Sequence, residues 1–265
     1  MSEEKSLSAT AEKKVAGRAE ELTAKIQSIE TGGAVDGPGI RYIVFFQGCQ
    51  FKCLYCHNRD TWDFKAGEEV TVGKLMDEIR TYAPFFKASG GGVTASGGEA
   101  SMQPRFVAEL FRQVHAAGFN TCLDTNGGIH NYTRDIVDLI NETDTFLLDL
   151  KAMDDEIHRK LTGRSNADTL AFARYLAEHG KKMWIRLVVV PTYTDDDGNA
   201  RKMGEFIREL GDAVERVELL PYHEMGKHKW AFFNDPYQLN DIHPPKADTM
   251  NRLKNILKEY HNEVY

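Results

Sequence analysis

The sequence has few cysteines and lacks a long apolar run. Only four of its 265 residues are cysteine, and three of these lie close together, which does not match the disulfide framework of a secreted protein. No stretch is apolar and long enough to span a membrane, and the first residues are polar and charged, unlike a signal peptide. We therefore expect a cytoplasmic protein that has no membrane partner.

The chain also lacks an excess of positive charge, sequence repeats and low-complexity linkers. Its formal net charge of −7 argues against a broad nucleic-acid surface, although a local basic groove stays compatible with it. Hydrophobic residues make up 42%, enough for a full core. We expect a charged extension over residues 1–24, helical or disordered, and one domain over residues 25–265.

Strand and helix patterns alternate along this domain. After a short strand at 26–29, strands are expected at 41–46, 93–96, 120–124, 145–150, 182–190 and 217–220. Helices are expected at 71–86, 106–114, 133–140, 154–161, 168–179, 202–210 and 246–260. Six such units indicate right-handed βαβ connections and a parallel sheet. They are too few for a closed eight-stranded barrel, so the α/β fold is expected to be an open, partial (βα)6 barrel.

Three cysteines, Cys49, Cys53 and Cys56, have the spacing C-x3-C-x2-C. Thiolates at this spacing can converge on one soft metal centre. One alternative is a zinc site completed by His57 or a distant residue, although adjacent residues rarely reach one ion together. The other is a four-iron cluster that has one iron open to a substrate. Cys122 is expected to be a small core residue.

Polar residues follow or interrupt each of the six expected strands. In a parallel α/β barrel the active site lies at the C-terminal strand ends, so these residues predict one shared cavity. In chain order they are the three cysteines, Gly97, Gly98 and Glu99, then Asp124 and Thr125, Asp149 and Lys151, Arg186, and His223. Simpler alternatives are a Gly-Gly-Glu turn, a helix cap at Asp124-Thr125, and structural ion pairs of Asp149, Lys151 and Arg186.

The cysteine spacing, together with the aromatic Tyr55 and the sequence SGGE, resembles the radical S-adenosylmethionine (SAM) enzymes. From about residue 26 to the C-terminus, the chain resembles the pyruvate formate-lyase activating enzymes of that superfamily. The motifs are DGPGIR, FFQGC, CLYCHNRDTWD, VTASGGEA, CLDTNG, DLK and ELLPYHEMGKHKW. The chain departs from the family in two places. Its first twenty or so residues precede the position where family members usually start, and the turn at Gly32-Gly33 lacks a cysteine that some relatives have there.

The resemblance implies one 4Fe–4S cluster, held by Cys49, Cys53 and Cys56, whose open iron chelates SAM. Reductive cleavage of SAM would give a 5′-deoxyadenosyl radical, which abstracts hydrogen from a specific glycine of pyruvate formate-lyase. Flavodoxin or a similar carrier is the implied electron donor. The activase of anaerobic ribonucleotide reductase and a non-catalytic zinc-binding regulatory protein remain rival interpretations. Activases that insert two further clusters are excluded, because only Cys122 is left over.

The resemblance also assigns roles to individual residues. Tyr55 and His57 are expected near the adenine, and Gly97, Gly98 and Glu99 near the methionyl end. The SAM pocket and the peptide path are expected to include Asp124, Thr125, Asp149, Lys151, Arg186 and His223, with a monovalent cation near Asp124 and Asp149. Lys151, Arg186 and Asp36 are expected to act in catalysis. Asp36 would order the loop 32–39 over a glycine-bearing peptide, or would merely form a turn.

Overall fold

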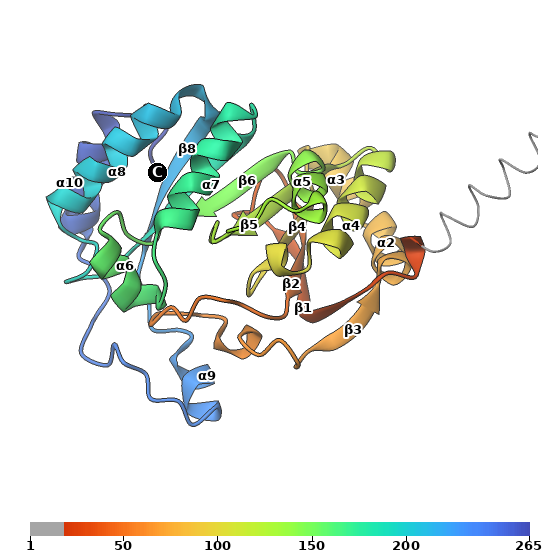
Figure 1. The fold of residues 1–265 in the computed structure, drawn as a ribbon, viewed down its shortest axis with the longest axis horizontal. Coiled ribbons are helices and arrows are strands. Elements are labelled where there is room, and N and C mark those ends of the chain that lie inside the picture. Colours follow the sequence, from red (N-terminus) through yellow and green to blue (C-terminus); the bar gives the residue numbers. More distant parts are fainter. Residues whose placement is uncertain (1–18) are drawn as a thin grey trace, which may run out of the picture.

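The computed structural model describes residues 19–265 (Figure 1). Most of the charged extension that we expect over residues 1–24 therefore lies outside the described residues. The first strand, β1 (Thr23–Gly33), begins at the end of that range. It is longer than the strand expected at 26–29, since it also includes the two glycines of the following turn.

One curved sheet of eight strands forms the centre of the molecule, in the order β3-β1-β2-β4-β5-β6-β7-β8. Six strands run parallel and confirm the expected series. They are β2 (Arg41–Phe46), β4 (Gly92–Gly97), β5 (Asn120–Thr125), β6 (Thr145–Asp149), β7 (Lys182–Val189) and β8 (Val214–Pro221). The sheet is not closed within the described residues, so the open, partial (βα)6 barrel is confirmed.

Two further strands extend the sheet on the side of β2. β1 pairs antiparallel with β2 and with β3 (Glu68–Thr71). The sequence analysis did not include β3, because its four residues EEVT offer one buried side chain and no clear alternation. An antiparallel edge of two strands therefore accompanies the six parallel strands.

Most of the helices cover the outer face of the sheet, and one short helix, Lys227–Phe232, lies apart from it (Figure 1). The helices are α2 (Val72–Thr81), α3 (Ala83–Ser89), α4 (Pro104–Ala116), α5 (Arg134–Asn141), α6 (Asp155–Thr162), α7 (Ala167–Glu178), α8 (Asp197–Leu210), α9 (Lys227–Phe232) and α10 (Ala247–Lys258). The helix expected over 71–86 is two helices that meet at Tyr82, and Pro84 lies in the first turn of α3. Proline has no backbone N–H, which suits the start of a helix and not its middle.

Strand β7 shows how the sheet separates its two faces. Its apolar residues Met183, Ile185, Leu187 and Val189 are buried in the main core under the helices. The intervening side chains point to the inner face of the sheet, as the period of two requires. Arg186 therefore faces the inside of the barrel although its neighbours are apolar. No helix among the described residues has the length and the apolar composition needed to cross a membrane.

Candidate active site

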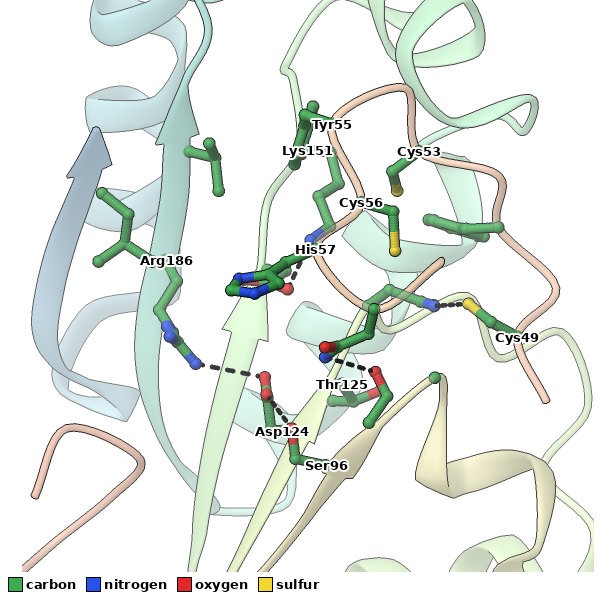
Figure 2. A pocket seen from close by; sticks show the side chains of 18 of the residues that line it. Cys49, Cys53, Tyr55, Cys56, His57, Ser96, Asp124, Thr125, Lys151 and Arg186 are labelled. Atoms are coloured by element: carbon green, nitrogen blue, oxygen red, sulfur yellow. Dashed lines mark hydrogen bonds and ion pairs between the residues drawn. The ribbon is translucent and has the colours of Figure 1, made fainter. Parts of the chain in front are cut away.

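A cavity of about 430 Å³ lies at the C-terminal ends of the parallel strands, a size typical of small-molecule sites. All of the site residues predicted from the sequence line it, except Glu99 and Asp36. Figure 2 shows the three cysteines on one side of the cavity and Arg186 on the opposite side. The convergence that we expected from polar residues at one end of the strands is therefore present in the structure.

Backbone hydrogen bonds to neighbouring segments hold the loop that carries the three cysteines. It begins at Gly48, whose φ of +96° favours glycine; the N–H of Gly48 donates to the carbonyl of Thr61 (2.7 Å). Farther along, the N–H groups of Lys52 and Leu54 donate to the carbonyls of Thr162 and Leu161, both at 2.8 Å. These two carbonyls belong to the last turn of α6, where helical carbonyls lack partners in their own helix.

All three cysteines of the loop are free thiols. Burial raises the pKa of each, and that of Cys53 to about 12. A hydrogen bond from the indole of Trp62 opposes this effect at Cys56. The metal-free protein therefore holds neutral thiols at neutral pH, and a metal centre must displace their protons when it binds.

The spread of these donors favours a cluster over a single ion. No three side chains of His, Cys, Asp or Glu within residues 19–265 lie close enough to hold one metal ion together. A zinc ion binds all its ligands at about 2.0–2.3 Å from one centre, whereas thiolates around a cluster each bind a different iron. Three thiols that border one cavity without meeting at one point fit an iron–sulfur cluster.

Charged side chains on or just after β5, β6 and β7 form two ion pairs in the cavity wall. Arg186 Nη1 lies 3.4 Å from Asp124 Oδ1, and Lys151 Nζ lies 2.5 Å from Asp149 Oδ2. Burial alone would lower the pKa of Lys151, but Asp149, Tyr55 and Cys53 together keep it well above its ordinary value. Lysine and arginine are therefore both charged in the site, each beside a carboxylate.

Two polar atoms in the cavity wall have no hydrogen-bond partner in the described chain. Arg186 Nε is buried without a hydrogen bond, and the nearest carboxylate oxygen, on Glu218, is 3.7 Å away. The hydroxyl of Tyr55 is likewise buried and unpaired. Buried polar groups are normally satisfied, so both atoms are exceptions among the residues that line this cavity.

His57, predicted near the adenine, and His223, predicted in the SAM pocket or the peptide path, both line the cavity. The rings of His57 and His223 are 5.2 Å apart and nearly perpendicular. Burial and the neighbouring His223 both lower the pKa of His57. A neutral His57 imidazole offers a hydrogen-bonding nitrogen and a ring face to a flat aromatic ligand.

The two glycines at the end of β4, Gly97 and Gly98, are required by close backbone contacts. A Cβ on Gly97 would lie 2.4 Å from the nitrogen of Phe46, and one on Gly98 would lie 2.4 Å from the carbonyl oxygen of Gly48. From sequence alone, we assigned these glycines to the approach of a ligand. The structure adds that they let the end of β4 pack against the cysteine loop.

Glu99 departs from the expected role, because its carboxylate lies behind the cavity wall. The side chain is 1% exposed. It accepts hydrogen bonds from the N–H of Ser101 (3.1 Å), the hydroxyl of Thr125 (2.8 Å) and the N–H of Asn126 (2.8 Å). Glu99 thus fixes the turn after β5, which presents Thr125 and Asn126 to the cavity, and does not itself line the cavity.

Asp36 also lies outside the cavity. Its loop precedes β2 and packs at the N-terminal ends of β4 and β5, where its carbonyl accepts a hydrogen bond from Thr94 (2.7 Å). Arg41 holds the loop in place: it is fully buried and donates to Thr94 and to the carbonyl of Pro38. In this structure the loop lies at the end of the barrel opposite the cysteines, and an ordering of the loop over a bound peptide stays a prediction.

Sequence reasoning missed several residues that line the cavity. Ser96 donates to Asp124 Oδ2 (2.6 Å), and Asn126 lies 3.8 Å from the Cys49 sulfur. Trp62 and Tyr222 complete the wall near Cys56. Ser96 and Asn126 are adjacent to predicted motifs, so the signal was present, whereas nothing in the sequence placed Trp62 next to a cysteine.

Known proteins have related sequences. The Radical SAM superfamily model matches residues 43–203. The pyruvate formate-lyase 1-activating enzyme of Escherichia coli K12 is 56% identical over 240 residues, which cover 91% of this chain and 97% of that protein. The pyruvate formate-lyase-activating enzyme of Staphylococcus aureus is 47% identical over 86% of this chain and 93% of its own.

Solved structures agree on the fold. A domain of pyruvate-formate lyase-activating enzyme from Bacteroides vulgatus has a TM-score of 0.55 and 23% identity, covering 66% of this chain and 98% of its own. Streptococcus suis SuiB bound to precursor peptide SuiA has a TM-score of 0.61 and 18% identity, covering 82% of this chain and 45% of its own. The chain therefore belongs to the radical SAM superfamily and, within it, to the pyruvate formate-lyase activating enzymes.

Proposed function

We propose that this protein activates pyruvate formate-lyase by abstracting a hydrogen atom from a specific glycine of that enzyme. The observation that supports this most directly is the convergence of three free thiols and two ion pairs on one cavity. The names of the relatives that match over nearly their whole length supply the target. The superfamily implies a 4Fe–4S cluster and SAM as the cofactors.

Cys49, Cys53 and Cys56 would hold the cluster. When bound there, the cluster supplies the electron that cleaves SAM to methionine and the 5′-deoxyadenosyl radical that takes the hydrogen. The protein's own task is to orient the reactants and to exclude water around them. Arg186 Nε and the Tyr55 hydroxyl, which make no hydrogen bond in this structure, are the proposed donors for that purpose.

The charged pairs are proposed to exchange partners when the ligand binds. Asp124 and Asp149 each have a cationic partner in this structure. A monovalent cation near the two carboxylates would replace part of that positive charge and free Lys151 or Arg186 for a ligand carboxylate or peptide carbonyl. In the proposal, Thr125 and the glycines after β4 complete the cofactor site.

The remaining roles concern partners. Asp36 is proposed to respond to the glycine-bearing peptide from its place at the N-terminal strand ends, where Arg41 orders its loop. Flavodoxin or a similar carrier is proposed as the electron donor on the family resemblance alone. These roles extend the central proposal and can fail without affecting it.

Anaerobic reconstitution tests the central proposal. The parent protein should bind iron and acid-labile sulfide, change its electron paramagnetic resonance spectrum when SAM is added, and form a glycyl radical on pyruvate formate-lyase. Cys49→Ala, Cys53→Ala and Cys56→Ala should each abolish the cluster, whereas Cys122→Ala, whose sulfur is in the core away from the cavity, should retain it. Zinc without acid-labile sulfide, or iron lost only in Cys122→Ala, would overturn the assignment.

A further inference from the structure

The indole of Trp62 makes a polar contact with one of the three cysteines. Trp62 Nε1 lies 3.3 Å from Cys56 Sγ, with the N–H as donor. An indole nitrogen can only donate, and a sulfur that becomes a metal-bound thiolate keeps lone pairs that accept. The corresponding contact at another cysteine is longer, since Asn126 Nδ2 lies 3.8 Å from Cys49 Sγ.

Neighbouring side chains fix the indole in this orientation. The ring of Trp230 packs against it edge-on, with 5.2 Å between centroids and an 80° angle between the planes. The guanidinium of Arg59 lies 4.2 Å from the ring centroid and the ammonium of Lys52 lies 4.7 Å from it. Arg59 is in turn held by Asp235 at 2.8 Å. The N–H group is thus held beside the sulfur by packing and by cation–π contacts.

We propose that Trp62 is a positioning residue whose N–H donates to the Cys56 thiolate of the bound cluster and raises the reduction potential of the cluster. The inference rests on the proposed function, because it needs a cluster at Cys56. Reduction by an external one-electron donor adds negative charge to the cluster and its sulfurs. The positive end of the N–H dipole stabilises that charge, so the reduced form gains more than the oxidised form.

The chain provides a matched control at the same cysteine. Trp230 Nε1 donates to the backbone carbonyl of Cys56 (3.1 Å) and not to its sulfur. Trp62→Phe and Trp230→Phe therefore each remove one indole N–H near Cys56 and keep an aromatic ring. Only the first change removes a donor from an atom that binds iron. A purely structural role of Trp62 predicts similar consequences for the two variants.

The test is the midpoint potential of the reconstituted cluster, titrated anaerobically without SAM and followed by electron paramagnetic resonance. At a fixed applied potential, Trp62→Phe should show about a tenfold lower ratio of reduced to oxidised cluster, equal to 59 mV for a one-electron couple. Trp230→Phe should stay close to the parent. A Trp62→Phe midpoint equal to that of the parent, or equal shifts in both variants, would overturn the proposal.

A second measurement covers the case in which Trp62→Phe fails to take up a cluster. In Trp230→Phe protein labelled with nitrogen-15 in its indoles, electron–nuclear double resonance of the reduced cluster should show an indole nitrogen coupling. The absence of that coupling would overturn the proposal. A parent protein that binds no iron and sulfide would instead refute the proposed function, so the two failures can be distinguished.

Discussion

Replacing Gly98 by alanine tests whether backbone packing requires the glycines after β4. Gly98 does not have a positive φ, so the change adds a steric contact without backbone strain. The new Cβ would lie 2.4 Å from the carbonyl oxygen of Gly48, a contact that must lengthen beyond 3.0 Å. That carbonyl also accepts the N–H of Glu99 at 2.8 Å. The end of β4 is thus bonded to the segment from which it has to move away.

The size of the effect follows from these two contacts. An overpacked contact costs about 1–3 kcal/mol, and loss of the Glu99–Gly48 hydrogen bond adds about 1 kcal/mol. Gly73→Ala is the matched control, because its Cβ would meet the nearest atoms of Glu20 at an ordinary 3.5 Å. Gly73 lies in the helix α2, where this change stabilises by about 0.5–1 kcal/mol. The same substitution should therefore have opposite signs at the two sites.

Thermal unfolding of the metal-free proteins measures both effects without interference from a cluster. For a domain of this size, about 2–4 °C in Tm corresponds to 1 kcal/mol. Gly98→Ala should unfold several degrees below the parent and Gly73→Ala slightly above it. Because Gly48 adjoins Cys49, Gly98→Ala should also bind less iron on reconstitution. A Tm for Gly98→Ala that equals or exceeds that of the parent would refute the packing argument.

Three further predictions concern single charged residues. Arg186→Ala leaves Asp124 without its buried partner, so it should destabilise by about 3 kcal/mol in denaturant titration and weaken SAM binding in calorimetry; unchanged affinity would contradict the site. Burial raises the pKa of Glu99 above its ordinary 4.5. The protonated side chain therefore stabilises the fold below about pH 4.5, and this stability is lost as the pH rises through the folded pKa. Glu99→Gln should therefore flatten the pH dependence of the unfolding free energy above about pH 4.5, and an unaltered slope would count against it. Asp36→Ala should keep the cluster and SAM affinity but lower the glycyl-radical yield at subsaturating partner, and an equal yield would reduce Asp36 to turn chemistry.

The parallel strands and most of the cavity could be predicted because periodicity and position carry that information. An arginine between Ile185 and Leu187 indicates the inner face of a strand whose other face is apolar. Once parallel strands are assumed, the residues at their C-terminal ends must meet at one edge. The cavity that contains Lys151 and His223 follows from that rule without any knowledge of distances.

What could not be predicted depends on contacts between segments far apart in the sequence. Glu99 follows a strand as a ligand-binding residue would, yet its carboxylate turns inward to donors from the turn after β5. Helix α9 is too short and polar for a periodic signal, so the sequence did not predict that Trp230 packs against Trp62. The pattern of the loop before β2 did not indicate to which end of the barrel its glycines direct it.

Because the cysteine loop is attached to the last turn of α6 by backbone hydrogen bonds, it should stay folded when a cluster is lost. The N–H groups of Lys52 and Leu54 satisfy the carbonyls that a helix end leaves open, and this pairing needs no metal. Many small zinc domains unfold when their metal is removed. In this protein, loss of the proposed cluster to oxygen would leave the loop ordered, with its three thiols in place to bind a new cluster. Exposure to air should therefore abolish activity while the protein stays folded.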